Sequence, residues 1–208
     1  MLMTDPTPPP IRAAWAAQDP LLTEYYDTEW GVSVRDERGV FERLTLEAFQ
    51  SGLAWLTVLR KRERFRLAFD HFDPEVVAAY TEEDVDRLLA DDGIIRNRAK
   101  ILATIANARA ILDLHREGRT LSELVWGFAP AVSPTPETDE DVPSTSAESV
   151  ALAKELKRYG FRFVGPTTMY ALMCAIGIVD AHLVSSHRRG CSDIWNTDGT
   201  KREPAAMV

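Results

Sequence analysis

Apolar residues recur at helical spacing along most of this chain, and this pattern constrains its fold more than any other feature. Residues 36–50, 99–117 and 146–159 each show an apolar stripe, and Gly118 follows the longest one as a stop signal. Paired hydroxyls and carboxylates that suit helix starts are Thr81 with Asp84, Thr120 with Glu123, and Thr145 with Glu148. Long alternating segments are absent from the sequence. We therefore predict an all-α fold of about nine or ten helices.

The chain divides into one folded domain and two tails. Residues 1–10 contain four prolines, which disfavour a helix, so we expect a disordered tail there. Residues 130–146 combine four prolines with several acidic residues and are typical of a loop between helical segments. We predict a single domain over residues 11–195, with a helical hairpin at about 158–176 and a mobile tail over residues 196–208.

Composition narrows the class of protein. A hydrophobic fraction of 45% with 27% charged residues is typical of a globular chain. No apolar run approaches the ~18 residues that cross a bilayer, and the N-terminus lacks the features of a signal peptide. Cys174 and Cys191 cannot form a disulfide framework, so we expect a cytoplasmic protein with no membrane partner. The GxxxxGK, HExxH, GxSxG and CxxC motifs are missing, which argues against nucleotide hydrolases, zincins and serine hydrolases.

Charge is distributed unevenly along the chain. The 24 basic and 32 acidic residues give a formal net charge of −8, which weighs against a nucleic-acid-binding protein. Residues 60–66 nevertheless hold five basic side chains and one acidic side chain, whereas residues 137–148 hold several acids and no base. A protein that is acidic overall can still carry a basic face. Composition therefore leaves DNA binding open.

One acidic residue lies within an aromatic-rich region near the front of the chain. Glu47 shares a helical face with Leu44 and Ser51 and lies one turn from Gln50. A carboxylate in such surroundings loses hydration unless it is paired or faces a pocket. Either Glu47 is solvated beside core aromatics, or it fixes the edge of a flat, cationic ligand that stacks on the rings. The aromatic residues of this region are Trp15, Tyr25, Tyr26, Trp30, Phe41, Phe49 and Trp55.

Glycines mark a second candidate site in the back part of the chain. A helix is expected to end near Gly160, and the next helix to begin after Gly165 with Pro166 in its first turn. A helical hairpin of this kind turns free backbone N–H groups outward and suits a phosphate. The alternative is a purely structural connection between two helices.

Short segments in a consistent order between about Trp15 and His182 carry a family resemblance. They are residues 18–21, 25–32, 46–55, 57–59, 61–63, 72–74, 93–96, 161–165 and 179–182. Together they resemble the DNA-3-methyladenine glycosylase I family, within the helix-hairpin-helix DNA glycosylases. The resemblance implies two helical lobes with a base pocket between them. It also implies an enzyme that flips 3-methyladenine out of alkylated duplex DNA and hydrolyses its N-glycosidic bond.

The resemblance also assigns site residues. The family's base-contacting carboxylate matches Glu47, and its DNA-holding hairpin matches residues 163–168. Aromatic faces can hold a cationic base while a carboxylate accepts a hydrogen bond from its amine. The expected aromatic pocket residues are Tyr25, Trp55, Trp15, Trp30 and Phe49. The expected DNA contacts are Gly165, Thr167, Thr168 and Arg162.

The family's zinc clasp is a first departure. In relatives, two cysteines and two histidines tie the chain ends together around zinc. The matching positions here are Ala13, Tyr26, His182 and Ser186, so only one of the four ligands of a structural zinc ion is present. We expect no cofactor, and we expect ordinary packing to join the chain ends, with Tyr26 near His182.

Asp180 is a second departure. Taken alone, Asp180 suits a helix cap and His182 a packed core imidazole. In the wider superfamily an aspartate at this place stabilises the developing sugar cation or orients water, although close relatives often lack it. Two interpretations stay open: Asp180 is a second catalytic residue that broadens the range of excised bases, or it is a cap.

The hairpin and the basic run bear on chemistry and DNA binding. Relatives that also cut the strand carry a lysine nucleophile where this chain has Thr167, so we predict a monofunctional glycosylase. The basic run 60–66 either is a solvated face paired with acids or lines the DNA-facing side of the protein. In the second case it acts together with Arg96, Arg98, Lys100 and Arg162.

The expected partner is double-stranded alkylated DNA, bound by a monomer in the cytoplasm at the nucleoid. Two alternatives stay open. One is the same fold with shifted or broader base specificity. The other is a non-catalytic helix-hairpin-helix DNA-binding protein, which would bind duplex DNA and release no base.

Overall fold

The computed structural model describes residues 9–203, which form ten α-helices and three short 3-10 helices and contain no named β-strand. The all-α prediction is confirmed, and residues 1–8 of the tail predicted at residues 1–10 lie outside the described residues. No helix within residues 9–203 has the length and apolar character needed to cross a membrane. The α-helices are α1 (Pro20–Thr28), α2 (Glu37–Gln50), α3 (Trp55–Leu59), α4 (Arg62–Ala68), α5 (Pro74–Ala78), α6 (Glu82–Ala90), α7 (Arg98–Arg116), α8 (Leu121–Trp126), α9 (Ala147–Arg158) and α10 (Pro166–Ala175).

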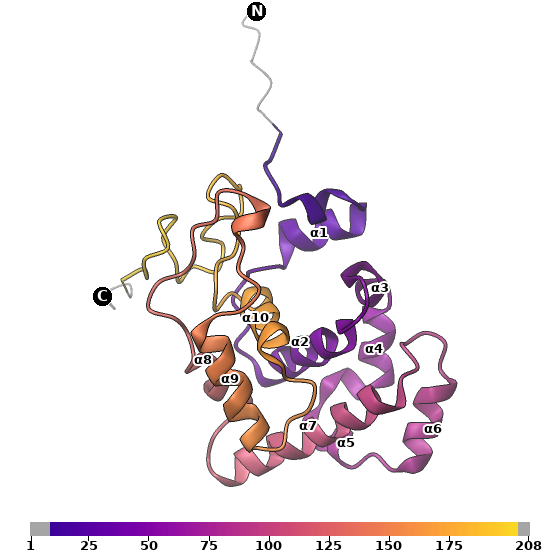
Figure 1. Cartoon of the computed structure of the whole chain (residues 1–208). Helices are drawn as coiled ribbons and strands as arrows, with labels where there is room; N and C mark the ends of the chain where they lie inside the picture. Colours follow the sequence, from indigo (N-terminus) through magenta and orange to yellow (C-terminus); the bar gives the residue numbers. More distant parts are fainter. Residues whose placement is uncertain (1–8, 204–208) are drawn as a thin grey trace, which may run out of the picture.

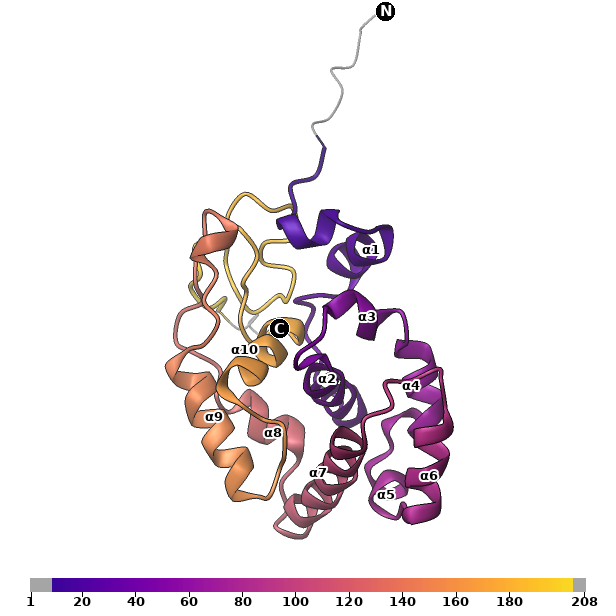
Figure 2. The ribbon, with the colours of Figure 1, turned by 45° about the vertical axis from the view of Figure 1, so that its right-hand side comes forward.

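Two helical lobes lie on either side of α2. In Figures 1 and 2, α3 to α6 lie on one side of α2 and α8 to α10 on the other, with α7 running beneath them and α1 above. The lobes share one hydrophobic core, to which α2 contributes Phe41 and Leu44 and α7 contributes Ile101 and Ile111. Helix α7 packs against α5 and α6 on one side, and its Asn107 bonds to the backbone between α9 and α10 on the other.

Helix ends follow the predicted capping signals, with one shift. Thr81 with Asp84 and Thr120 with Glu123 form capping boxes at α6 and α8, as predicted. The start predicted at Thr145 is wrong by one residue, because the Ser146 hydroxyl accepts the Ser149 N–H at 3.1 Å and so caps α9. Local pairing of a hydroxyl with the backbone three residues on decides where the first turn begins.

The predicted hairpin is present between α9 and α10. Gly160 follows the end of α9 with a φ of +87°, a left-handed conformation that residues other than glycine rarely adopt. Gly165 is the N-cap of α10, and Pro166 occupies its first position, where no N–H is needed. We call residues 159–165 the hairpin turn.

The C-terminal segment differs from the prediction of a mobile tail from residue 196 onward. The Trp195 ring is fully buried, and its Nε1 donates to the Ile178 carbonyl at 3.1 Å. The backbone of Asn196 bonds to that of Thr200 at 2.8 Å, and the Gly199 carbonyl accepts from the Ser133 N–H at 2.8 Å. The prediction is wrong for residues 196–202, because this turn is fastened to the predicted loop 130–146. Residues 204–208 lie outside the described residues.

Candidate active site

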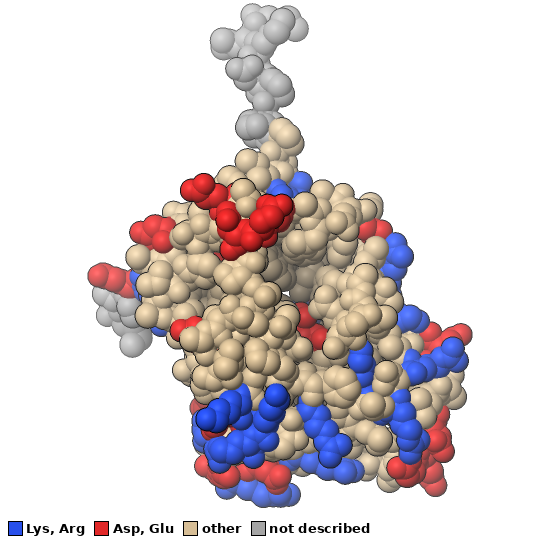
Figure 3. Space-filling view, in the orientation of Figure 1, with Lys and Arg blue, Asp and Glu red and all other residues tan. Residues whose placement is uncertain are grey.

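A pocket of about 520 Å³ opens between the two lobes, within the ~300–1,000 Å³ that is typical of small-molecule sites. Its walls come from α1, α2, α3, α10 and the loop residues 142–144. Figure 3, in the orientation of Figure 1, shows a hollow near the centre of the molecule with acidic atoms inside it. Glu47 is the acidic residue among those that line the pocket.

Glu47 projects from the last turns of α2 into this pocket. Its side chain is buried, with 7% of the residue exposed, and it has no hydrogen-bond or ion-pair partner among residues 9–203. Burial raises the pKa of the Glu47 carboxyl to about 8, and the positive charge of Arg43 offsets only part of this effect. A cationic ligand in the pocket would supply the charge that the carboxylate lacks. The structure therefore favours a pocket residue over a solvated one.

Four of the five predicted aromatic pocket residues line the pocket, namely Trp15, Tyr25, Trp30 and Trp55. The rings of Tyr25 and Trp55 lie 5.4 Å apart, and those of Trp15 and Trp30 meet edge to face at 5.4 Å. Burial raises the pKa of the Tyr25 hydroxyl, which therefore stays protonated at neutral pH. These rings form an apolar wall on which a flat base can stack.

Phe49 is the exception, and its predicted place in the pocket is wrong. Its ring is fully buried in the core, 4.7 Å from the ring of Phe65, and it does not line the pocket. Phe49 follows Glu47 by two residues, which places it about 200° further around the helix axis. The two side chains therefore point to nearly opposite faces of α2.

Sequence reasoning missed a second wall of the pocket. It is formed by Thr167, Tyr170, Ala171 and Cys174 of α10. Their spacing of three, four and seven residues marks one helical face, and this spacing was the signal available in the sequence. Of these residues, only Thr167 was predicted as a site residue, and it lies at the exposed end of this face.

Asp180 lies outside the pocket in a closed network of hydrogen bonds. Its Oδ1 contacts His182 Nδ1 at 2.7 Å and accepts from the His182 N–H, and its Oδ2 accepts from the Gly190 N–H at 2.7 Å. Burial alone would raise the pKa of Asp180, but the hydrogen bonds and the charges of His182 and Arg189 lower it. Only Ala181 of this segment lines the pocket. The structure therefore supports neither interpretation: Asp180 does not line the pocket, which argues against a catalytic role, and no helix begins among residues 181–203, so it is not a helix cap.

Comparison with known proteins identifies the family. The model of the methyladenine glycosylase family matches residues 15–189. DNA-3-methyladenine glycosylase 1 of Escherichia coli is 47% identical over 176 residues, which cover 83% of this chain and 94% of that protein. The chain belongs to the methyladenine glycosylase family. The predicted resemblance is thereby confirmed.

Solved structures agree with this membership. A structure of 3-methyladenine DNA glycosylase I aligns with a TM-score of 0.82 at 45% identity, covering 85% of this chain and 98% of the other. A Staphylococcus aureus structure that concerns 3-methyladenine recognition has a TM-score of 0.79 at 34% identity, covering 83% and 93% of the two chains. A Haemophilus influenzae relative is 41% identical over 83% of this chain and 94% of its own length.

The positions that match the family's zinc clasp are occupied by Ala13, Tyr26, His182 and Ser186, which pack together in this chain. The Tyr26 hydroxyl lies 2.8 Å from the Ser186 hydroxyl, and the Tyr26 and His182 rings meet edge to face at 5.1 Å. Ala13 packs against Tyr26. No group of three or more His, Cys, Asp or Glu side chains within residues 9–203 is arranged to hold a metal. These residues therefore do not fit a four-ligand zinc ion.

Further contacts join the two chain ends around this cluster. Arg12 pairs with Asp27 through two hydrogen bonds of 2.6 and 2.8 Å, and His187 Nε2 lies 3.1 Å from the same carboxylate. The backbone N–H of Ala14 donates to Asp139 of the acidic loop at 3.0 Å. The front segment that carries Trp15 is thus held by both the loop and the C-terminal segment.

The basic run 60–66 is paired rather than free. Among its members, Arg62 bonds to Glu29, Arg64 to Asp91 and Arg66 to Glu42. Arg60 pairs with Asp19, and Lys61 donates to the Asp92 carbonyl. The structure therefore favours the solvated, acid-paired face over a DNA-facing one.

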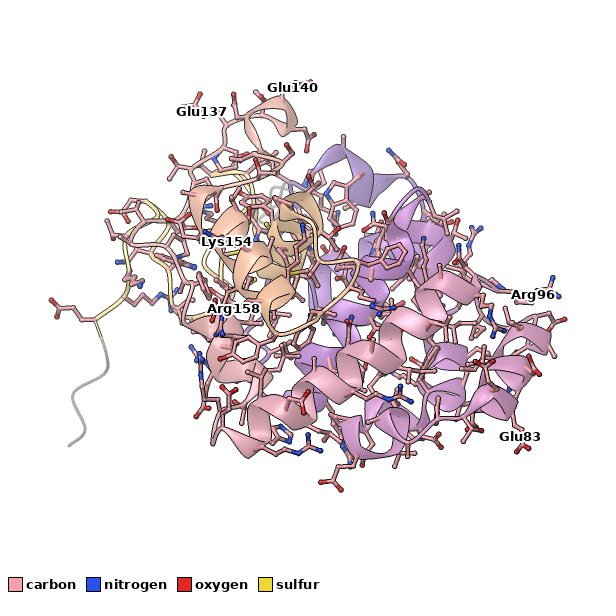
Figure 4. All side chains as sticks on the ribbon, turned by 60° about the horizontal axis from the view of Figure 1, so that its bottom comes forward. Glu83, Arg96, Glu137, Glu140, Lys154 and Arg158 are labelled. Atoms are coloured by element: carbon pink, nitrogen blue, oxygen red, sulfur yellow. The ribbon has the colours of Figure 1, made fainter. Side chains whose placement is uncertain are left out.

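Other candidate DNA contacts separate into two groups. Arg98 pairs with Glu82, and Lys100 is buried rather than facing DNA as one interpretation expected. The exposed cations without a carboxylate partner among residues 9–203 include Arg96, Lys154, Lys157 and Arg162. Figure 4 shows Lys154 on α9 and Arg96 on the opposite lobe, with Glu137 and Glu140 of the acidic loop at the far end of the molecule. Gly165 and Thr168 are half-buried at the start of α10.

Proposed function

We propose that this chain is a DNA-3-methyladenine glycosylase, which takes alkylated DNA and hydrolyses the bond between the damaged base and its sugar. The observation that carries the proposal is the buried, unpaired carboxyl of Glu47 at the floor of an aromatic pocket. Relatives at 41% and 47% identity bear this enzyme's name, and one related structure is a complex with 3-methyladenine.

The charge of the damaged base explains how the pocket selects it. Methylation at N3 makes the base positively charged while it is attached to the sugar. Entry of this cation favours the ionised form of Glu47, which then accepts a hydrogen bond from the exocyclic amine. The faces of Tyr25 and Trp55 contact the same cation. Neutral adenine carries the same amine but no positive charge, so it gains neither the electrostatic attraction to an ionised Glu47 nor the cation–π contact.

The positive charge of the base also lowers the barrier to cleavage of the glycosidic bond. When the bond between C1′ and the base breaks, its electron pair neutralises the base, and water adds to C1′ with loss of a proton. The cationic base is a good leaving group without protonation by the enzyme. The pocket therefore contributes selection and placement of the base rather than strong acid catalysis.

Access to the pocket requires the nucleotide to leave the duplex. Residues 50–54, here called the rim turn, join Glu47's helix α2 to Trp55 at the pocket mouth. Gly52 has a φ of +80° with open space around it, and Leu53 is 40% exposed. An exposed apolar side chain on such a turn suits the space that a flipped base leaves in the stack. The hairpin turn and the unpaired cations Lys154, Lys157 and Arg162 suit the DNA backbone.

The chemistry is that of a monofunctional glycosylase. A Schiff base needs a free amine at the reacting sugar, and no lysine lines the pocket in the described part of the chain. Thr167 occupies the exposed end of the α10 wall. Borohydride treatment during turnover should trap no covalent complex with DNA, and a trapped complex would overturn this assignment.

The enzyme is proposed to work without zinc, as a monomer, in the cytoplasm at the nucleoid. Support for the first point is the cluster of Ala13, Tyr26, His182 and Ser186, whose side chains contact one another and offer one imidazole as ligand. Elemental analysis of the purified protein should find well under one zinc per chain, and chelator should leave its melting temperature unchanged. Light scattering should give the mass of one chain.

Base release from methylated duplex DNA tests the proposal and its alternatives. Chromatography of the released bases should show 3-methyladenine, at a lower rate for Glu47→Gln. Release of neutral as well as cationic bases at similar rates would favour the alternative of broader specificity. Binding to duplex DNA with no released base would instead identify a non-catalytic DNA-binding protein.

A further inference from the structure

Helix α7 buries three polar side chains on one face, and two of them, Lys100 and Asn107, bond outside the helix, whereas Thr104 bonds to the Lys100 carbonyl. Lys100 and Asn107 are 7% and 1% exposed. They are seven residues apart, which is about two turns of an α-helix, so they lie on one face with an axial offset of about 10 Å. Neither side chain has a carboxylate partner among residues 9–203. Both bond instead to the backbone of other segments.

Lys100 holds the start of the rim turn. Its ammonium group donates to the Phe49 carbonyl at 2.9 Å and to the Ser51 carbonyl at 2.6 Å. Both carbonyls belong to the C-terminal end of α2, where a positive charge is favourable. The turn then closes on itself through the Leu53 N–H and the Gln50 carbonyl, which are 2.6 Å apart. Lys100 thereby fixes the segment that joins Glu47's helix to Trp55.

Asn107 holds the hairpin turn in a similar way. Its Oδ1 accepts from the Arg162 N–H at 2.7 Å, and its Nδ2 donates to the Arg162 carbonyl at 3.2 Å. The two hydrogen bonds fix the backbone of Arg162. The next residue, Phe163, has a φ of +56°, so the chain turns sharply there. Figures 1 and 2 both show the segment between α9 and α10 lying beside α7.

A buried lysine at position 100 carries both a cost and a gain in stability. Burial lowers the pKa of Lys100, so the surroundings disfavour its charged form. An apolar side chain of the same length would avoid that cost, but the Phe49 and Ser51 carbonyls would lose a donor. The ammonium group thus satisfies two carbonyls at the end of α2 and links them to α7.

We propose that Lys100 and Asn107 are positioning residues that hold the rim turn and the hairpin turn in register on α7. This inference rests on the proposed glycosylase function. One turn would face the vacated site in the stack and the other the DNA backbone. Because both turns are tied to the same helix, their positions relative to each other would be fixed before DNA binds.

Two substitutions test the register, and the chain offers a matched control. Lys100→Met and Asn107→Leu remove the bonds to the rim turn and to the hairpin turn. Arg109→Met is the control, because Arg109 is also on α7 and donates to two carbonyls, those of Ala78 at 2.9 Å and Tyr80 at 3.2 Å. Those carbonyls lie near α5, away from both turns. Each variant is assayed for excision from methylated duplex DNA and for affinity toward free 3-methyladenine.

The two variants should affect different kinetic constants. Lys100→Met should lower kcat for excision by about tenfold or more, because small misplacements of a group that acts on the substrate cost this much. Asn107→Leu should raise KM for duplex DNA by about tenfold and leave kcat within about threefold. Free 3-methyladenine should bind both variants with a Kd within about twofold of the wild type, since the pocket stays intact. Arg109→Met should change neither constant.

Other results would overturn the inference. One is that Lys100→Met loses excision and affinity for the free base to the same extent. Another is that excision is unchanged in both variants. A third is that Arg109→Met loses excision as much as the two variants do. If Lys100→Met does not fold, Lys100→Gln, which keeps a donor but is too short to hold both carbonyls, is judged by the same criteria. Absence of 3-methyladenine release by the wild type would refute the proposed function instead.

Discussion

Replacing Glu47 by Gln should make the protein more stable, and increasingly so as the pH rises. The carboxyl has an ordinary pKa of 4.5, and burial raises it to about 8 in the folded state. A group whose pKa is raised on folding contributes stability that is fully present below pH 4.5 and is lost as the pH rises toward 8. The loss is about 1.4 kcal/mol per pH unit in the middle of this window and smaller near either pKa, which gives about 3 kcal/mol between pH 5 and pH 8. An uncharged amide of the same shape avoids this loss.

Urea denaturation at pH 5, 6, 7 and 8 measures the effect. The free energy of unfolding of Glu47→Gln minus that of the wild type should increase by about 3 kcal/mol from pH 5 to pH 8. Glu83→Gln is the control, because Glu83 is an exposed glutamate on α6, and its difference from the wild type should stay constant. If the wild type and Glu47→Gln change in parallel over this range, the carboxyl is not buried as described. The reasoning about the pocket would then be refuted.

Three further substitutions probe residues around the pocket. Asp180→Asn should lower the free energy of unfolding by about 3 kcal/mol in urea denaturation, because it removes a buried charge from its partners. The folded variant should still excise the base at about the wild-type rate, and a large fall in that rate would indicate a catalytic role for Asp180. Tyr26→Phe should cost about 1 kcal/mol of stability through loss of the bond to Ser186, and an unchanged unfolding midpoint would exclude that bond. Phe49→Ala should cost about 4 kcal/mol in the same assay. Its affinity for free 3-methyladenine should not change, and a lost affinity would return Phe49 to the pocket.

Local sequence patterns predicted what depends on neighbouring residues. Apolar spacing located α2, α7 and α9 to within a residue or two at each end, because amphipathic packing and caps are decided within a few positions. The turn at Gly160 and the start of α10 at Pro166 followed from backbone preferences of single residues. The pocket residues Glu47 and Trp55 were predicted from the family resemblance as well as from aromatic density.

Features that depend on distant segments could not be predicted in this way. Lys100 is typical of an exposed helix start, and only the carbonyls of residues 49 and 51 make its burial possible. The sequence leaves two interpretations of the basic run open, and only the folded structure shows its acidic partners, such as Glu29 and Asp91. Asp180 matched a catalytic position in sequence, but its oxygens bond to His182 and Gly190. Each of these partners comes from a tertiary contact that no short pattern contains.

The central claim is that an ionised Glu47 recognises a cationic base, and the pH profile of kcat/KM tests it most directly. Excision of 3-methyladenine from methylated duplex DNA is measured between pH 6 and 9, for the wild type and Glu47→Gln. Because kcat/KM reports the free enzyme, the wild-type value should rise by up to about tenfold per pH unit and level off near the pKa of about 8. The Glu47→Gln profile should be lower and flat. A wild-type profile that is flat over this range, or that Glu47→Gln reproduces, would contradict the account.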